Sequence, residues 1–130
     1  MTLPGVPDGY RTLSPYLAVE DAEGLLSFVS KVFDTEVRRR MPGDAGGLHA
    51  EVELGDSVLM VGEGGGMSFP AMLHVYVEDS DATYKRALAA GATSVAEPHD
   101  TSFGDHRSAF EDAWANQWWV ATRVQDRPNA

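Results

Sequence analysis

The chain runs twice through the same order of strand and helix patterns, and this repetition constrains its fold more than any other feature. The run Val-Glu-Asp occurs at residues 19–21 and again at 77–79, 58 residues further on (77 − 19). Each copy follows an alternating segment typical of a half-buried strand and precedes a segment of helical character. Because the short match stands at the same junction of two similarly ordered units, it indicates duplication of one supersecondary unit.

The first unit reads as a strand, a helix and three further strands. Alternation predicts a strand over 11–19, and Asp21 is a candidate N-cap for the helix that follows. One apolar stripe with helical spacing runs along this helix and consists of Leu25, Phe28, Val29, Val32 and Phe33. Glycine-containing turns separate the remaining strands, which are expected near 35–41, 48–54 and 57–62.

The second unit repeats this order after a flexible connector at 63–66. A strand over 72–77 is expected to lead into a helix from about 81 to 90, which ends at Gly91 because glycine accepts the left-handed conformation past a helix end. Three strands complete the unit and are expected near 93–97, 106–111 and 117–123.

These patterns predict an α+β fold made of two βαβββ modules within one domain, residues 1–130. The modules are expected over about 9–63 and 70–125. Their strands are expected to pair into one curved mixed sheet, with both helices on the convex side and a cleft on the concave side. A hydrophobic content of 43% with 23% charged residues is ordinary for such a globular domain.

Alternation also assigns the strand residues to the two faces of the predicted sheet. Toward the helices we expect Leu13, Leu17, Val19, Leu73, Val75 and Val77. Toward the cleft we expect Ser14, Tyr16, Ala18, Met72, His74 and Tyr76. Alignment of the last strands of the two modules at Ser57 and Gln117 places Leu59 and Trp119 on the concave side as well.

The composition excludes several classes of function. With no cysteine, the chain has no disulfide, thiolate metal site or cysteine nucleophile. A net charge of −10 repels phosphate backbones, so no nucleic-acid partner is expected, and the acidic surface serves either cationic ligands or solubility alone. No leader-like start or run of 18 apolar residues occurs, which predicts a cytoplasmic protein without membrane contact.

Several motifs, in this order, resemble the vicinal oxygen chelate superfamily, which includes glyoxalase I, ring-cleaving dioxygenases and fosfomycin and bleomycin resistance proteins. The motifs are LAVED at 17–21, HAEVELGDSVLM at 49–60, VYVEDSDATY at 75–84, Ala90-Gly91-Ala92, FGDHR at 103–107 and NQWWVAT at 116–122. The sequence is most similar to the PhnB-like branch, and the likeness covers about 11–125. One departure lies in the turn at 112–116, where Asn116 is expected to take the left-handed conformation and Trp114 packs over the sheet or lines the cleft mouth.

The resemblance implies a divalent metal ion held by His, Gln and Glu side chains from the first and last strands of each module. The corresponding positions here are Ser14, Leu59, Met72 and Trp119, which are not credible ligands for such an ion. We therefore expect no cofactor. An alternative site for one divalent metal ion would use His49, Glu51 and His74, although His49 and Glu51 are equally explained as solvated or bonded to Arg38 or Arg40.

A cleft without metal ligands but with aromatic side chains favours the capture of a flat apolar molecule. Among bleomycin resistance proteins, the resemblance implies a homodimer that sequesters a drug. The candidate ligand-binding residues are Tyr16, Arg38, His49, Leu59, Met72, His74, Tyr76, Phe103, Trp114 and Trp119. The opposing interpretation, that the aromatic residues are core, is preferred for Trp118 and Phe110.

We accordingly hypothesise a small-molecule-binding protein that sequesters an aromatic natural product or antibiotic. A metal-dependent lyase, isomerase or dioxygenase of the same fold remains the alternative, and a regulatory module without a small ligand is a third. His99 and His106, in or beside the loop 98–104, are expected to be idle rather than catalytic.

Overall fold

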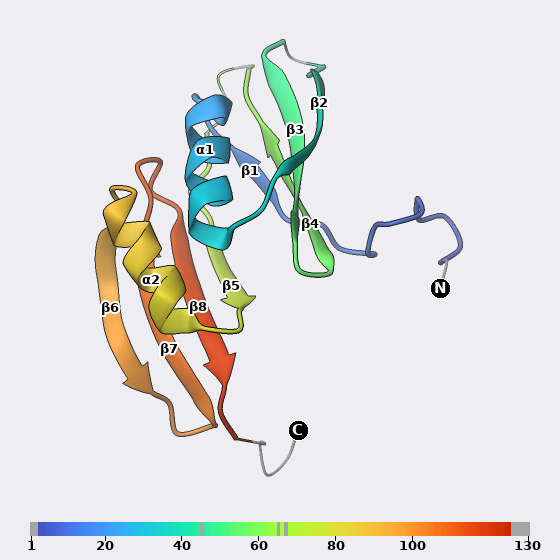
Figure 1. Cartoon of the computed structure of the whole chain (residues 1–130). Coiled ribbons are helices and arrows are strands. Elements are labelled where there is room, and N and C mark those ends of the chain that lie inside the picture. Colours follow the sequence, from blue (N-terminus) through green and yellow to red (C-terminus); the bar gives the residue numbers. More distant parts are fainter. Residues whose placement is uncertain (1–2, 45, 65, 67, 126–130) are drawn as a thin grey trace. The chain divides into compact units, whose positions relative to one another are not determined.

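The computed structural model describes residues 3–44, 46–64, 66 and 68–125. The chain divides into two compact units, Met1–Phe69 and Pro70–Ala130, and in the described residues each unit holds one helix and one four-stranded sheet (Figure 1). Gly65, within the predicted connector, lies outside the described residues.

The first unit has the predicted βαβββ order. Its elements are β1 (Tyr16–Ala18), α1 (Ala22–Phe33), β2 (Val37–Pro42), β3 (Leu48–Leu54) and β4 (Ser57–Gly62). The strand order is β1-β4-β3-β2, with β1 parallel to β4 and the other pairs antiparallel. The helix α1 packs against β3 and β4.

The second unit has the same order and the same topology. Its elements are β5 (Met72–Tyr76), α2 (Ser80–Ala89), β6 (Thr93–Asp100), β7 (Asp105–Glu111) and β8 (Gln117–Arg123). The strand order β5-β8-β7-β6, with β5 parallel to β8, repeats that of the first unit and confirms the two βαβββ modules. Hydrogen bonding joins the strands within each module, so the sheet expected as one is formed as two four-stranded sheets.

Both helices begin at the aspartate of the repeated Val-Glu-Asp run. The Asp21 side chain accepts a hydrogen bond from Gly24 N at 2.9 Å, and the Asp79 side chain accepts one from Ala82 N at 3.1 Å. Each cap satisfies a backbone donor that the helix itself leaves unpaired, a contribution of about 1 kcal/mol. The sequence match therefore marks equivalent positions of the two modules. At the end of α2, Gly91 has the expected positive φ, 104°.

The core of the first unit lies between α1 and its sheet. The helix buries Leu25, Leu26, Phe28, Val29 and Val32, and the sheet buries Leu17, Val52, Leu59 and Val61 against them. The register pairs Leu17 with Val61 and Val52 with Leu59, so these four residues share the face toward α1.

The predicted facing of Leu59 is therefore wrong. Tyr16 pairs with Met60 in β4, whereas the equivalent His74 pairs with Trp119 in β8. The modules are thus 58 residues apart at their first strands (74 − 16) but 59 apart at their last (119 − 60). An alignment at Ser57 assumes 60, and a one-residue error turns a strand over. Met60, not Leu59, lies on the face away from α1.

Leu13 is a second correction, because it lies before β1 and is 83% exposed instead of facing the helix. Pro15 stands between Leu13 and the strand, and proline has no N–H to donate to a ladder, so the strand begins only at Tyr16. The Pro15 carbonyl still accepts a hydrogen bond from Met60 N at 2.9 Å.

The core of the second unit contains the two aromatic residues that were assigned to it. Trp118 and Phe110 pair across β8 and β7 and are both fully buried, on the side of the sheet covered by α2. Trp118 Nε1 donates to Asp112 Oδ2 at 2.9 Å, so its polar atom is satisfied inside the core.

The turn between β7 and β8 takes a different shape from the predicted one. Ala115, with φ 68°, occupies the left-handed position expected for Asn116. Asn116 is instead held by Asp112, whose Oδ1 accepts from the Asn116 backbone N at 3.0 Å. Its own Oδ1 accepts from Ala71 N at 3.0 Å. The asparagine is therefore used for its side-chain hydrogen bonds and not for its backbone freedom. Within the described residues, no helix is long and apolar enough to cross a membrane.

Candidate functional site

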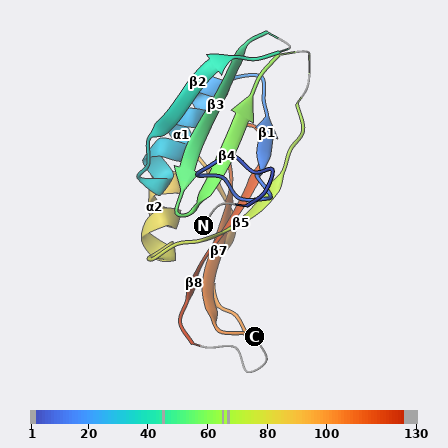
Figure 2. The same ribbon diagram turned by 90° about the vertical axis from the view of Figure 1, so that its right-hand side faces the viewer.

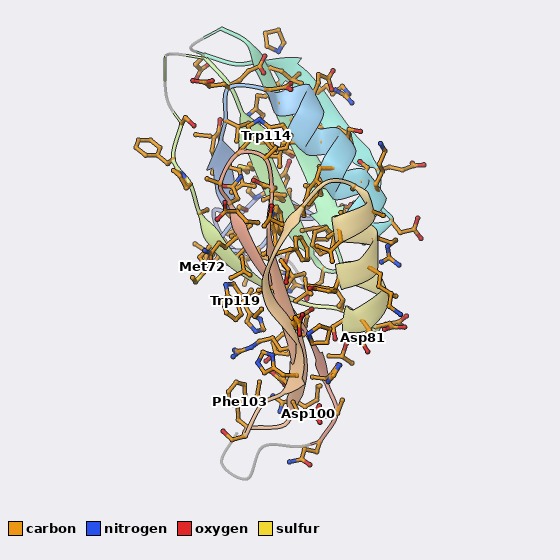
Figure 3. The ribbon with its side chains drawn as sticks, turned by 90° about the vertical axis from the view of Figure 1, so that its left-hand side faces the viewer. Met72, Asp81, Asp100, Phe103, Trp114 and Trp119 are labelled. Atoms are coloured by element: carbon orange, nitrogen blue, oxygen red, sulfur yellow. The ribbon has the colours of Figure 1, made fainter. Side chains whose placement is uncertain are left out.

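The second sheet has one face away from α2, here called the helix-free face of the second sheet. The strand register places on it Met72, His74 and Tyr76 of β5, Gln117, Trp119 and Ala121 of β8, and Asp105, Arg107 and Ala109 of β7. Met72 is 68% and Tyr76 52% exposed. Figure 3 shows Met72, Trp119 and Phe103 on the opposite side of this unit from α2 and Asp81. The predicted facing of Met72, His74, Tyr76 and Trp119 is confirmed.

Trp119 and Phe103 share one cationic neighbour. The guanidinium carbon of Arg107 lies 5.0 Å from the Trp119 ring centre and 5.6 Å from that of Phe103. Both distances fall within the range of cation–π attraction. The indole N–H of Trp119 donates to Gln117 Oε1 at 3.2 Å, which fixes the orientation of the ring. Two aromatic rings and one guanidinium therefore form a continuous surface on the helix-free face.

Tyr76 is held by a buried carboxylate. Its hydroxyl donates to Asp105 Oδ2 at 2.9 Å, while Asp105 Oδ1 lies 3.3 Å from Arg123 Nη1. The rings of His74 and Tyr76 lie 4.9 Å apart in a tilted arrangement. Tyr76 is consequently oriented with its ring on the helix-free face and its polar end occupied.

Sequence reasoning missed Arg107. It lies in β7 between His106 and Ser108, both of which point to the α2 side, so alternation alone could have placed it on the same face as Trp119. The FGDHR motif was used only for the resemblance, and the phase of its strand was not followed.

The first unit carries a chain of polar contacts on the face of its sheet away from α1. The Tyr10 hydroxyl donates to Glu51 Oε1, Glu51 Oε2 lies 3.4 Å from His49 Nε2, and His49 Nδ1 lies 3.3 Å from the Tyr16 hydroxyl. Figure 2 shows the N-terminal segment, which contains Tyr10, running across this sheet. Arg40 points to the other side, where it pairs with Glu23 of α1.

The same contacts set the acidity of two groups in this chain. Burial opposes ionisation of Glu51, but hydrogen bonds from Tyr10 and His49, together with the charge of Arg39, outweigh it and lower the pKa of the carboxyl. The hydrogen bond to Glu51 raises the pKa of the Tyr10 hydroxyl. Glu51 is therefore a carboxylate stabilised under the N-terminal segment.

A pocket of about 390 Å³ lies beside this chain of contacts, within the first unit. Tyr16 and His49 line it together with the hairpin residues Met41 and Leu48. The Tyr16 ring lies against Gly62 of β4 so closely that a Cβ at Gly62 would collide with the phenol. Only glycine at that position allows the ring to lie flat along the strand.

The predicted site residues thus divide between the two units. Tyr16 and His49 meet in the first unit, Arg38 pairs with Glu53 at 3.1 Å and lies over the Tyr10 ring, and Leu59 is buried toward α1. Gathered on the helix-free face of the second sheet are Met72, His74, Tyr76, Phe103 and Trp119. Trp114 lies in the β7–β8 turn, half-buried, where its backbone N donates to Asp112 Oδ1 at 2.9 Å.

The metal ligand set implied by the resemblance does not fit this chain. At the paired positions of the first and last strands stand Tyr16 with Met60 and His74 with Trp119, and only His74 is of the implied ligand type. Within the part of the chain that the structure describes, no three His, Cys, Asp or Glu side chains are grouped to hold a metal ion. His49 and Glu51 of the alternative site do lie together on β3.

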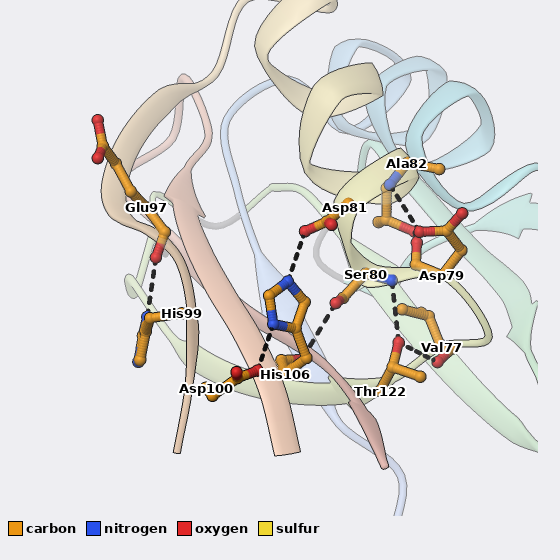
Figure 4. A network of polar contacts seen from close by, with 11 residues as sticks. Val77, Asp79, Ser80, Asp81, Ala82, Glu97, His99, Asp100, His106 and Thr122 are labelled. Atoms are coloured by element: carbon orange, nitrogen blue, oxygen red, sulfur yellow. Dashed lines mark hydrogen bonds and ion pairs between the residues drawn. The ribbon is translucent and has the colours of Figure 1, made fainter. Parts of the chain in front are cut away.

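His106 has a structural role, on the α2 side of its sheet. Its Nε2 lies 2.9 Å from Asp81 Oδ1 of α2, and its Nδ1 lies 2.7 Å from Asp100 Oδ1 of β6 (Figure 4). The hydrogen bonds to Asp100 and Asp81 raise the pKa of the imidazole. His106 belongs to β7 and ties α2 to β6, whereas His99 Nδ1 contacts only the Glu97 carbonyl, at 2.8 Å, among the described contacts.

Three comparisons place this geometry among known proteins. The family model described as the Glyoxalase/Bleomycin resistance protein/Dioxygenase superfamily matches residues 11–120. An uncharacterized protein of Mycobacterium bovis is 33% identical over 128 residues, which cover 88% of this chain and 84% of that protein.

Two solved structures share the fold. TioX from Micromonospora sp. ML1 matches with a TM-score of 0.74 and 24% identity, covering 88% of this chain and 99% of that one. TnmS3, described as an antibiotic binding protein from Streptomyces sp. CB03234, matches with a TM-score of 0.73 and 18% identity, covering 88% and 96%.

Proposed function

The chain belongs to the glyoxalase/bleomycin resistance protein/dioxygenase superfamily, and from this premise we propose that it binds a small aromatic molecule and sequesters it unchanged. The ligand would be a natural product or antibiotic, as in self-resistance. No metal ion takes part in this function. The protein would act in the cytoplasm as a homodimer, a state that sedimentation measurement of the purified protein can test.

The aromatic surface on the helix-free face of the second sheet carries this proposal. Trp119, Phe103 and Tyr76 offer ring faces there, and exposed Met72 adds an adaptable thioether next to them. Stacking between aromatic rings contributes about 0.5–1.5 kcal/mol per pair beyond the burial of apolar area. Such a surface suits a planar ring system better than it suits an extended polar chain.

Antibiotic binding by a protein of the same fold supports the ligand class. TnmS3 is described as an antibiotic binding protein, and 88% of the present chain matches it. The misfit of the implied metal ligands supports retention of the ligand without chemical change.

A thermal-shift screen of planar aromatic antibiotics, run with and without added divalent metal ions, tests the proposal. We expect at least one compound to raise the melting temperature to the same extent in both conditions, because the ligand stabilises only the folded chain. Stabilisation by aromatic compounds only when a metal ion is present would contradict sequestration without a metal.

A second candidate function is a metal-dependent lyase, isomerase or dioxygenase. It is favoured by one observation, the approach of His49 and Glu51 to within 3.4 Å beside a pocket of about 390 Å³. Elemental analysis distinguishes the two functions. Tightly bound Fe, Mn, Ni or Zn at one ion per chain, lost in His49→Ala, would favour the enzyme.

A further inference from the structure

Arg107 occupies an unusual position for a cation, on a sheet face and against two aromatic rings. The rings of Trp119 and Phe103 both lie within 6 Å of its guanidinium carbon. A guanidinium that contacts ring faces through its plane keeps its N–H groups directed outward at its edge. Five donors are available on this group, and cation–π contacts use none of them.

The donors of Arg107 are not used within the part of the chain that the structure describes. Its Nε is buried without a hydrogen-bond partner, and no carboxylate there lies within ion-pair distance of the guanidinium. A buried donor without a partner costs about 1–3 kcal/mol, so such groups generally have a partner in the functional state.

The neighbouring carboxylate does not neutralise Arg107, although it lies two residues away on the same strand face. Asp105 accepts the Tyr76 hydroxyl at 2.9 Å and faces Arg123 at 3.3 Å. These contacts direct the negative charge of Asp105 toward Tyr76 and Arg123. The positive charge of Arg107 is thereby left beside the aromatic surface.

We propose that the aromatic ligand of this face carries an acidic group, a carboxylate or an ionised phenol, and that Arg107 binds it while Trp119 and Phe103 contact the ring. This inference rests on the proposed function and adds the charge of the ligand to it. Arginine suits the role because its planar edge donates two parallel hydrogen bonds to a carboxylate.

The overall charge of the chain makes this local cation decisive for an anionic ligand. A net charge of −10 repels anions at long range, but at physiological ionic strength this repulsion is screened beyond about 8 Å. Close to the sheet, the charge of Arg107 and its free donors dominate. The acidic surface therefore does not by itself select cationic ligands.

Calorimetric titration with two matched probes tests the inference: 2-naphthoate, and its neutral isostere 2-naphthamide. The native protein is expected to bind 2-naphthoate roughly 10- to 100-fold more tightly than 2-naphthamide, because hydrogen bonds to a charged group are the stronger ones. Arg107→Gln should remove this difference while leaving the affinity for 2-naphthamide unchanged. Lys85→Gln, which removes one positive charge from the exposed side of α2, should keep the difference.

The two probes separate failure of this inference from failure of the proposed function. Equal affinities in the native protein, or an unchanged preference for 2-naphthoate in Arg107→Gln, would overturn the role of Arg107 and leave aromatic binding intact. If neither probe binds, aromatic binding itself is contradicted, and this inference with it. Retained 2-naphthamide binding by Arg107→Gln shows that the variant is folded.

Discussion

Trp119 is the residue on which aromatic binding depends most directly. It is half-buried, its indole N–H is fixed by Gln117, and one ring face contacts the guanidinium of Arg107. Its neighbour Trp118 has the same chemistry but is fully buried on the other face of the sheet. The two adjacent tryptophans therefore separate ligand contact from core packing.

We expect Trp119→Ala to weaken the binding of a planar aromatic ligand by more than tenfold, because it removes both the stacking surface and its apolar area. Fluorescence titration or calorimetry measures the affinity, and circular dichroism checks that the fold is retained. Leu88→Ala, which removes an exposed apolar side chain from α2, is the control and should bind normally. Unchanged affinity in Trp119→Ala would show that the ligand does not contact this face.

At the scale of single residues, alternation predicted facing well where a strand is long and regular. It placed Met72, His74, Tyr76 and Trp119 correctly. It failed at Leu59, because the two modules differ by one residue between their first and last strands and sequence comparison does not reveal where.

The turn between β7 and β8 is an element held together by one buried carboxylate. Asp112 accepts hydrogen bonds from Trp114 N, from the backbone and side chain of Asn116, and from Trp118 Nε1. These bonds hold Trp118 in the core and align β8 beside β7.

Asp112→Ala should lower the free energy of unfolding by about 3 kcal/mol, because it leaves buried donors of Asn116 and Trp118 without an acceptor. Urea denaturation measures the loss. Glu111→Ala removes the adjacent carboxylate, which has no side-chain hydrogen bond among the described residues, and should change stability by no more than about 0.5 kcal/mol. A similar small effect in both variants would disprove the role of Asp112.

Histidine 106 connects three elements, since the imidazole on β7 reaches Asp81 of α2 and Asp100 of β6. Its pKa is raised in the folded chain. A raised pKa means that protonation favours folding, so the contribution is fully present below the unfolded pKa of about 6.5 and is lost as pH rises through the folded pKa. Both aspartates are at least half exposed, which screens the interaction.

We therefore expect the difference in unfolding free energy between native protein and His106→Gln to be largest at acidic pH, above the titration of the aspartates, and to shrink as pH rises. Denaturation at a series of pH values measures this difference, which cancels the general effect of the net charge. His99→Gln should show no such trend. A difference that is constant or grows with pH would contradict a protonated His106 in the folded chain.

Element by element, most of the secondary structure could be predicted because its stops and starts are local. The aspartate caps, Gly91 and the turn residues act within a few positions of themselves. The shortened β1 was missed because Pro15 removes a ladder donor, an effect that alternation does not include.

On the scale of the whole molecule, the duplication repeats topology without repeating chemistry. The helix-free face of the second sheet is aromatic and carries Arg107, whereas that of the first sheet carries the Tyr10–Glu51–His49–Tyr16 contacts. A duplicated fold supplies two equivalent surfaces, and side-chain replacement can then specialise each one, since function is set by sites and not by fold.

The sequence by itself determined the two βαβββ modules, the helices and their caps, and the aromatic character of the candidate site, because these follow from periodicity and from short-range hydrogen bonding. Only the tertiary structure decided which partner each polar group takes. Strand register brings Tyr76 to Asp105, His106 to both aspartates and Arg107 to Trp119, and register depends on pairing between segments far apart in the chain.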